Sequence, residues 1–386
     1  SVENFERWTS RGGKDAAATE AGLKREIARL RDAPVTASEL AEAKNELLTS
    51  AIRESETAEG QASLIANAVI VGGDAREANS EPVAIAAVTA ADIQRVARKY
   101  LGDNQAVTIR YLPAADGKTS DRIALAPTVA VAALKAPADI KIWTPATGAD
   151  RVASPAPGAL VAANLPKPVT TKLANGLTVI TVPKPGQPIV TAWLAADGGG
   201  RLDRPDRAGA ASLTAELMTK GTTKRSATQL AAATEALGTA LGSGVTRDGA
   251  TIGLTVKSDQ IGPALGILAE VATSPKLADD ELARARAQAL DNVQLSLADP
   301  GELASLAAPR TVFGGASYGT PLDGSPTSLK AITTADARAI WAGTWRPEGA
   351  TLILVGDITA ERARALAQGA FGAWKGAPTN RMALVP

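Results

Sequence analysis

Ser317 lies in a pattern that could serve nucleophilic catalysis. The residues Gly315-Ala-Ser317-Tyr-Gly319 match Gly-x-Ser-x-Gly, in which a strand-to-helix turn presents the serine hydroxyl to a histidine base. The chain of 386 residues contains no histidine. A serine paired with a lysine can act without one, but the sequence places no lysine near Ser317. The pattern therefore does not predict a serine hydrolase.

A second pattern is the segment Gly209-Ala-Ala-Ser212-Leu-Thr-Ala215-Glu216-Leu-Met-Thr-Lys-Gly221-Thr222. It resembles the signature helix of the M16 peptidases (insulinase, pitrilysin and mitochondrial processing peptidase), in which Gly-x-Ala precedes His-x-x-Glu-His and Lys-Gly-Thr follows. In that motif two histidines one turn apart hold Zn²⁺, and the glutamate takes a proton from the metal-bound water. The resemblance places the ligands at Ser212 and Glu216 and the base at Ala215.

The resemblance also implies a third ligand, a glutamate on a later helix, and its position falls at Asn292. Protein zinc sites are built mainly from histidine and cysteine, and the chain has neither. We therefore expect no metal, no cofactor and no catalytic residue in this chain, the four degenerate positions being Ser212, Ala215, Glu216 and Asn292. The alternative interpretation of the segment, which we favour for the chain as it stands, is an amphipathic core helix.

Composition and charge exclude several classes of protein. Hydrophobic residues make up 45% and charged residues 21%, as in ordinary globular proteins, and the net charge is +1 with the two signs interleaved. These values predict no nucleic-acid partner. No run of about 18 apolar residues occurs, so we expect no membrane insertion. The first residues do not form a signal peptide, and we expect the chain to begin downstream of any targeting sequence.

The first hundred residues are predicted to be helical. Leu23, Ile27 and Leu30 share one face of a helix that Pro34 ends. Capping boxes begin two further helices, which we expect over 36–55 and 89–100, and a third is expected over 61–71 before two glycines. Residues 107–112 alternate as a strand.

Residues 114–168 are rich in alanine and proline. Proline at this density blocks helices and central strands, which predicts an extended linker. Because the segment also carries apolar residues, we expect it to pack on the domains that it joins.

From residue 169 the pattern is that of a new domain. An Asn175-Gly176 turn predicts a hairpin over 170–182, and a third strand is expected over 189–195. The three glycines at 198–200 could form a phosphate loop, but no Gly-Lys-Ser/Thr follows them and a turn is the better prediction. A second hairpin is expected through 247–256, and helices over 226–237, 260–272 and 279–297.

An internal repeat supports two copies of one unit. The residues from Val88-Thr-Ala-Ala-Asp92 to Tyr111 match those from Ile332-Thr-Thr-Ala-Asp336 to Val355 at a constant offset, since 332 − 88 = 244 and 350 − 106 = 244. Each copy joins a capping box, a helix and an apolar strand. The predicted fold class is α+β, with a mainly antiparallel sheet covered by helices in two repeated units. The first copy lacks its opening strands.

The resemblance covers most of the chain. It implies M16-type (LuxS/metallohydrolase-like) domains, with 1–113 the C-terminal part of one domain, 114–168 the linker, and 169–386 a domain with a degenerate zinc motif that includes Tyr318-Gly319 and Gly356-Asp357. Tyr318 is expected to cap a turn, as in the family.

The function that the resemblance implies is that of a non-catalytic half of a zinc metallopeptidase. Such a half forms chamber wall and peptide contacts, while the zinc and the catalysis belong to a catalytic M16 module in the same polypeptide or a separate subunit. The partners implied are that module and a peptide substrate. A periplasmic or other extracytoplasmic bacterial compartment is a guess from the resemblance alone. The alternative is a scaffold or assembly subunit of the same fold without a proteolytic role.

Overall fold

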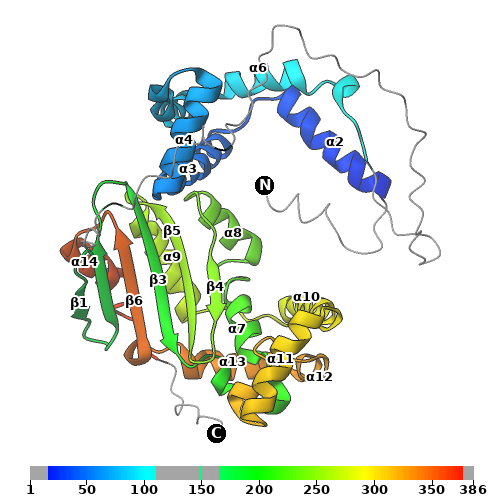
Figure 1. Ribbon diagram of the computed structural model, residues 1–386, viewed down its shortest axis with the longest axis vertical. Coiled ribbons are helices and arrows are strands. Elements are labelled where there is room, and N and C mark those ends of the chain that lie inside the picture. The colour runs from blue at the N-terminus through cyan, green and yellow to red at the C-terminus, as the bar shows by residue number, and fades with distance from the viewer. Residues whose placement is uncertain (1–15, 110–147, 149–157, 159–164, 377–386) are drawn as a thin grey trace. The chain divides into compact units, whose positions relative to one another are not determined.

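The computed structural model describes residues 16–109, 148, 158 and 165–376 (Figure 1). Most of the predicted linker 114–168 lies outside these residues. The division of the chain at 113 and 168 therefore stays a prediction.

The N-terminal part is helical, as predicted. Thr36 with Glu39, and Thr89 with Asp92, form the expected capping boxes. Gly73, in the left-handed region with φ 81°, ends the third predicted helix, the last turn of which is a π-helix. The elements are α2 (Ala16–Asp32), α3 (Ala37–Glu54), α4 (Ala58–Asn67), η1 (Ala68–Gly72), η2 (Ala75–Asn79), α5 (Ser80–Ala87), α6 (Ala90–Tyr100) and η3 (Asp103–Gln105). Only α5 and the 3₁₀ turns were not predicted.

The strand predicted over 107–112 is wrong for the residues that the structure describes. Residues 107–109 form no strand, and the side chains of Val107 and Ile109 are 90% and 88% exposed. A strand needs a partner for its backbone N–H and C=O groups, and the first copy of the repeat shows no other strand among its described residues. Residues 110–112 lie outside the described part.

A six-stranded sheet forms the centre of the second part, in the order β1-β2-β6-β3-β5-β4. Only β2 and β6 pair in parallel, and the other four neighbouring pairs are antiparallel. Both predicted hairpins are present. The strands are β1 (Val169–Lys172), β2 (Thr178–Pro183), β3 (Ile189–Asp197), β4 (Gly242–Val245), β5 (Gly249–Lys257) and β6 (Ala350–Gly356). The mainly antiparallel α+β fold is thus confirmed.

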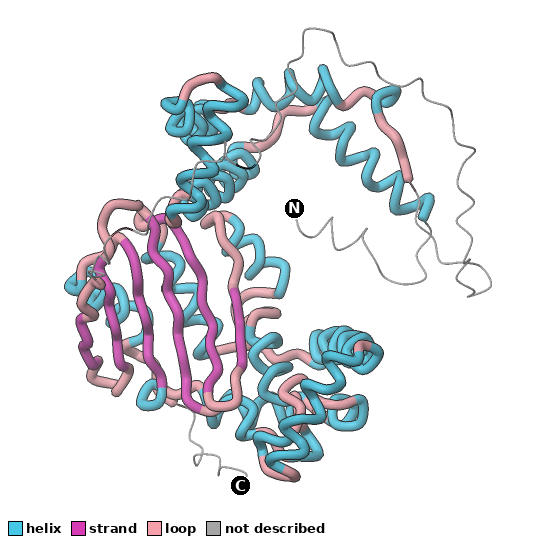
Figure 2. Tube along the Cα trace, in the orientation of Figure 1, coloured by secondary structure: helices cyan, strands magenta, loops and turns pink. Residues whose placement is uncertain are grey.

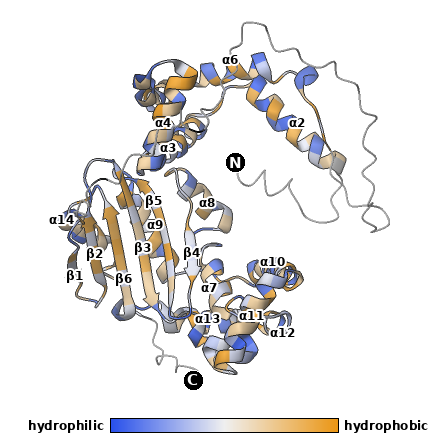
Figure 3. Cartoon of the chain, in the orientation of Figure 1, coloured by the Kyte–Doolittle hydropathy of each residue, from blue (hydrophilic) through white to orange (hydrophobic). Residues whose placement is uncertain are grey.

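Helices cover one face of this sheet. Along β3, Ala192, Leu194 and Ala196 are buried, whereas Trp193 is 38% exposed, because successive side chains point to opposite faces. The helix α9 (Ile261–Thr273) contacts β3 and β5, and α14 (Ala360–Phe371) contacts β2. Both helices lie behind the sheet in Figures 1 and 2. No described helix crosses the front face of the sheet in these views. Figure 3 shows that the strands of the sheet consist largely of apolar residues.

The remaining elements gather mainly beside β4. They are η5 (Gly199–Leu202), η6 (Pro205–Arg207), α7 (Ala210–Met218), α8 (Ala227–Glu235), α10 (Asp279–Ala298), α11 (Pro300–Phe313), η7 (Ser317–Gly319), α12 (Pro326–Ala331), α13 (Thr334–Thr344) and η8 (Pro347–Gly349). The short helix α7 contacts α10, α13 and β4. These contacts hold the degenerate motif against the edge of the sheet.

The repeat is visible in the helices. Helix α13 spans Thr334–Thr344 and α6 spans Ala90–Tyr100, so both ends differ by 244 residues (334 − 90 = 344 − 100 = 244). Both begin with a capping box. Helix α13 packs on α7, whereas α6 packs on α2. The two copies therefore share the helix that begins at the capping box, but this helix packs on a different neighbour in each copy.

Candidate functional site

The degenerate motif lies on α7, which begins at Gly209. This residue is in the left-handed region with φ 92°, and a Cβ there would lie 3.1 Å from backbone atoms of Asp323 and Gly324. A side chain at this position would be strained by both its backbone conformation and the close approach of the 323–324 turn. The glycine that the motif begins with is thus required by the local backbone.

Asp203, which no sequence pattern marked, caps the N-terminus of α7. Its side chain is 3% exposed. Its two carboxylate oxygens each accept a 2.9 Å hydrogen bond, one from the N–H of Gly209 and one from the N–H of Ala211. Free N–H groups at a helix start favour an acceptor, and an anion most of all. Asp203 therefore fixes the orientation of α7.

The pKa of Asp203 reflects two opposed effects. Burial disfavours the charged carboxylate and raises the pKa from about 3.8 to about 7, although the N–H donors of Ala211, Gly209 and Ala210 and the charge of Arg247 lower it. The carboxyl group that positions α7 consequently exchanges its proton near neutral pH. It is a cap rather than a candidate catalytic acid, because both of its oxygens are bonded to the backbone.

On α7, the three motif positions hold a hydroxyl, a methyl group and a carboxylate. Ser212 donates a 3.1 Å hydrogen bond to the carbonyl oxygen of Leu322. Ala215 is 3% exposed and packs in the core. Glu216 lies one turn after Ser212 on the same half-buried side, and its backbone carbonyl accepts from Thr219. Of the three side chains, only that of Glu216 carries a good metal ligand.

Asn292 lies on α10, the helix that α7 contacts. It follows Ala289, which packs against the core, by three residues, so both lie on one side of α10. Its side chain is exposed, and its oxygen accepts a 3.0 Å hydrogen bond from Gln288. Catalytic zinc requires three protein ligands, usually imidazole, thiolate or carboxylate, and an amide and an engaged hydroxyl do not supply them. The residues at these positions therefore do not fit a zinc ion.

No other metal cluster takes their place in the described part of the chain. Across residues 16–109 and 165–376, no group of three or more histidine, cysteine, aspartate or glutamate side chains could hold a metal ion. In the same residues, no helix is both long enough and apolar enough to cross a membrane.

The end of the motif anchors α7 to α9. The hydroxyl of Thr222 donates to Glu270, a largely buried residue of α9, and Arg225 forms an ion pair with the same carboxylate. Thr222 Oγ1 in turn accepts from the backbone N–H groups of Lys224 and Arg225. The Lys-Gly-Thr ending of the motif is thus explained by a hydrogen-bonded turn that needs no metal.

Ser317 is not a nucleophile elbow. It is buried in η7, which follows α11 and not a strand, and its carbonyl oxygen accepts from Arg247 and Thr320. Tyr318 donates a 2.7 Å hydrogen bond to Asp248, which raises the pKa of the phenol, and so ties this turn to the β4–β5 hairpin. The glycines at 198–200 form a turn against the same hairpin, where a Cβ at Gly199 would lie 2.2 Å from the carbonyl oxygen of Thr246.

Beside α7, strand β4 presents a free edge. It is the last strand in the sheet order, with β5 as its one strand neighbour among the described residues. The N–H of Thr246 donates to Gly249 on the β5 side. Because alternate N–H groups of a strand point to opposite edges, those of Ser243 and Val245 point away from β5. An extended chain could pair with this edge.

Comparisons with known proteins agree with the fold and the motif. The family model described as insulinase (peptidase family M16) matches residues 178–324. An uncharacterized zinc protease of Streptomyces coelicolor is 23% identical over 188 residues, which are 49% of this chain and 41% of that protein. The chain thus spans about half the length of such relatives.

Solved structures show the same fold. The crystal structure of an M16 peptidase inactive domain from Pseudomonas fluorescens matches with 29% identity and a TM-score of 0.53, over 57% of this chain and 53% of that one. The periplasmic protease PqqL from Escherichia coli matches with 19% identity and a TM-score of 0.51, over 59% of this chain and 26% of that one. The second match bears on the fold alone.

Proposed function

We propose that this chain, which belongs to the insulinase (M16) family of peptidases and is a non-catalytic module of it, forms chamber wall and a peptide-binding surface for a catalytic module. That module lies elsewhere in the parent protein or in a complex, and the parent is a zinc metalloendopeptidase. The peptide is its substrate.

One observation carries this proposal: the residues that support the motif are in place, whereas its ligand and base positions hold other residue types. The turn at Gly209, the cap at Asp203 and the anchor at Thr222 and Glu270 are all in place. The four positions that would do the chemistry hold Ser212, Ala215, Glu216 and Asn292. A fold that keeps the support of a site without its reactive groups can still shape and bind what the reactive groups act on.

The free edge of β4 supports a peptide-binding role. An extended peptide adds to an exposed edge by main-chain hydrogen bonds, which do not depend on its sequence. The outward N–H groups of Ser243 and Val245 supply the donors, and α7 lies alongside. The face of the sheet that no described helix covers adjoins this edge and is the surface proposed as chamber wall.

Removing one outward donor from β4 is expected to weaken peptide binding. Ser243 is exposed, and proline is tolerated on an edge strand, so Ser243→Pro deletes an N–H without removing a ladder bond. Loss of one hydrogen bond of about 1 kcal/mol corresponds to a roughly fivefold higher Kd for an unstructured peptide, measured by fluorescence anisotropy. Ser243→Ala, which keeps the N–H, is the matched control and is expected to bind like the original chain.

Two outcomes contradict the proposal in different ways. Equal binding by the proline and alanine variants would place the peptide away from the β4 edge. Absence of any peptide binding by the unmodified chain would instead favour the scaffold or assembly subunit.

A further inference from the structure

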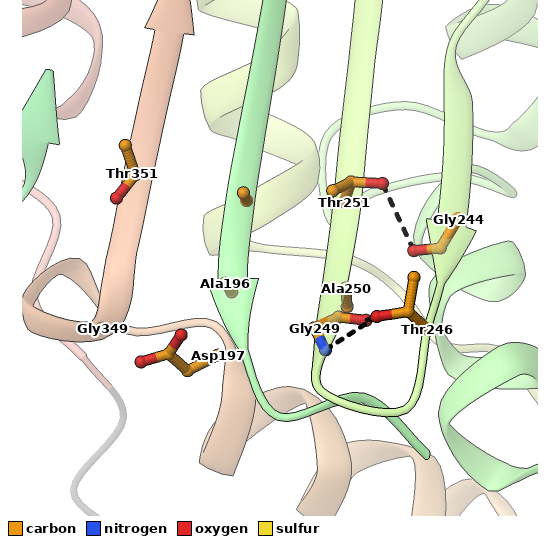
Figure 4. Close-up of a pocket in the computed structure, with 10 residues that line it drawn as sticks. Ala196, Asp197, Gly244, Thr246, Gly249, Ala250, Thr251, Gly349 and Thr351 are labelled. Carbon is orange, nitrogen blue, oxygen red and sulfur yellow. Dashed lines mark hydrogen bonds between the residues drawn. The ribbon is translucent and has the colours of Figure 1, made fainter. Parts of the chain in front are cut away.

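We propose that the open face of the sheet carries a subsite for a basic side chain, lysine or arginine, of a bound peptide. The subsite is a cavity of about 210 Å³ at the end of β3, shown in Figure 4. The proposal rests on the peptide-binding role proposed above and adds a preference for peptides with a basic side chain. The volume suits one long side chain and lies below the roughly 300–1,000 Å³ of pockets for drug-sized ligands.

The strand register builds the floor of this cavity. Ala195 of β3 pairs with Thr351 of β6 on one side and with Thr251 of β5 on the other, and Thr251 pairs with Gly244 of β4. Residues that pair across neighbouring strands point to the same face. The row Thr351–Ala195–Thr251–Gly244 thus has small residues at Ala195 and Gly244 and a hydroxyl on each side of Ala195.

Asp197 supplies the charge. It lies two residues beyond Ala195 on β3, on the same face and about 7 Å along the strand. In Figure 4 its carboxylate extends from the end of β3 toward the start of β6. Among the ten described residues that line the cavity, Asp197 is the only charged one, and its carboxylate forms no hydrogen bond or ion pair with any described residue.

The hydroxyl groups complete a set of acceptors. Thr251 donates to the carbonyl oxygen of Gly244 at 3.4 Å, which leaves the lone pairs of its own oxygen free to accept. Thr351 lies opposite it across Ala195. An ammonium or guanidinium group only donates hydrogen bonds, and the cavity offers a carboxylate and hydroxyl oxygens as acceptors. None of the lining residues is a cation that would compete for the carboxylate.

An aromatic side chain lies on the same face of the sheet, outside the residues that line the cavity. Trp193 lies two residues before Ala195 on the same face. Its ring covers Gly253, where a Cβ would lie 2.6 Å from ring atoms, and reaches to within 3.6 Å of a Cβ at Gly242. A lysine or arginine stem can pack on such a surface while its charged end reaches a carboxylate.

A basic side chain fits this site better than a metal ion. Ca²⁺ takes six to eight oxygen ligands and Mg²⁺ usually one or two carboxylates with several waters and phosphates. The cavity offers one carboxylate, and no group of three or more acidic side chains in the described part of the chain is arranged to hold a metal ion. Charge complementarity with a single cationic side chain is therefore the stronger match.

The test compares two short unstructured peptides that differ only in having arginine or glutamine at the same positions. Binding to the full chain is measured by fluorescence anisotropy at low salt. We expect the arginine peptide to bind about three- to tenfold more tightly, a preference that salt reduces. Asp197→Asn should abolish the preference, and Ala195→Leu, which fills the cavity, should do the same without removing a charge.

Asp291→Asn is the matched control, because Asp291 is likewise an exposed aspartate and lies on α10, away from the sheet. It should leave the preference unchanged. Equal binding of both peptides to the unmodified chain overturns the subsite but leaves the peptide-binding role intact. Failure of both peptides to bind overturns both. If the Asp197→Asn variant still prefers the arginine peptide, another group recognises the positive charge, and the subsite is likewise overturned.

Discussion

Three substitutions are expected to give this chain about one bound zinc ion. Ser212→His and Glu216→His place two imidazoles one helical turn apart on α7, and Asn292→Glu supplies a carboxylate from α10, which contacts α7. Ala215 is left unchanged at first, because it is 3% exposed and a glutamate there would be buried. Metal analysis after gel filtration measures the zinc content.

The control keeps the three new side chains and breaks their spacing. It combines Ser212→His, Lys220→His and Asn292→Glu with Glu216→Ala, which removes the native carboxylate, and Lys220 lies beyond the end of α7 and cannot share a zinc ion with position 212. We expect this variant to bind no stoichiometric zinc. A folded triple variant that binds no more zinc than its control would show that the ligand positions are wrongly assigned.

Asp203→Ala is expected to have the largest effect on stability. It leaves the buried N–H groups of Gly209 and Ala211 without acceptors. Loss of a cap costs about 0.5–2 kcal/mol, and each unsatisfied buried group costs about 1–3 kcal/mol, so we expect a loss of roughly 2–4 kcal/mol in urea unfolding near pH 5. Asp206→Asn, an exposed neighbour in surface ion pairs, should cost under about 1 kcal/mol.

The same residue predicts a pH dependence. The pKa of Asp203 is about 7 in the folded chain and near 3.8 without burial. Below about pH 3.8 both states are protonated and the contribution of Asp203 is fully present. Between these two pKa values the unfolded chain has lost the proton that the folded chain keeps, so stability falls by about 1.4 kcal/mol for each rise of one pH unit. The stability advantage over Asp203→Asn should shrink from pH 4 to pH 8, and a constant difference would contradict the raised pKa.

Local signals made most of the helices and strands predictable. The capping boxes at Thr36, Thr89, Ser226 and Thr333 each begin a helix in the structure, because the bonds that form them lie within four residues. Helix α11 was missed because Pro309 interrupts it and its apolar residues form no buried stripe. The strand expected over 107–112 is wrong for residues 107–109, because an alternating pattern does not show whether a partner strand is present.

The site was predictable only in part. The positions on α7 and α10 follow from the resemblance to the M16 motif, and the absence of a catalytic function at Ser212, Ala215, Glu216 and Asn292 stays a prediction. Asp203 acts on a helix that begins seven residues later, and no local pattern signals that contact. The cavity is lined by residues of four strands, which the register of the sheet brings together. A single sequence does not reveal that register.

The most direct measurement of the central claim is the zinc content of the unmodified chain together with its action on a bound unstructured peptide. We predict no stoichiometric zinc after incubation with the metal, and a peptide that binds and stays intact, because the ligand positions hold a serine, a glutamate and an asparagine. About one tightly bound zinc per chain, with peptide cleavage that a chelator abolishes, would contradict it.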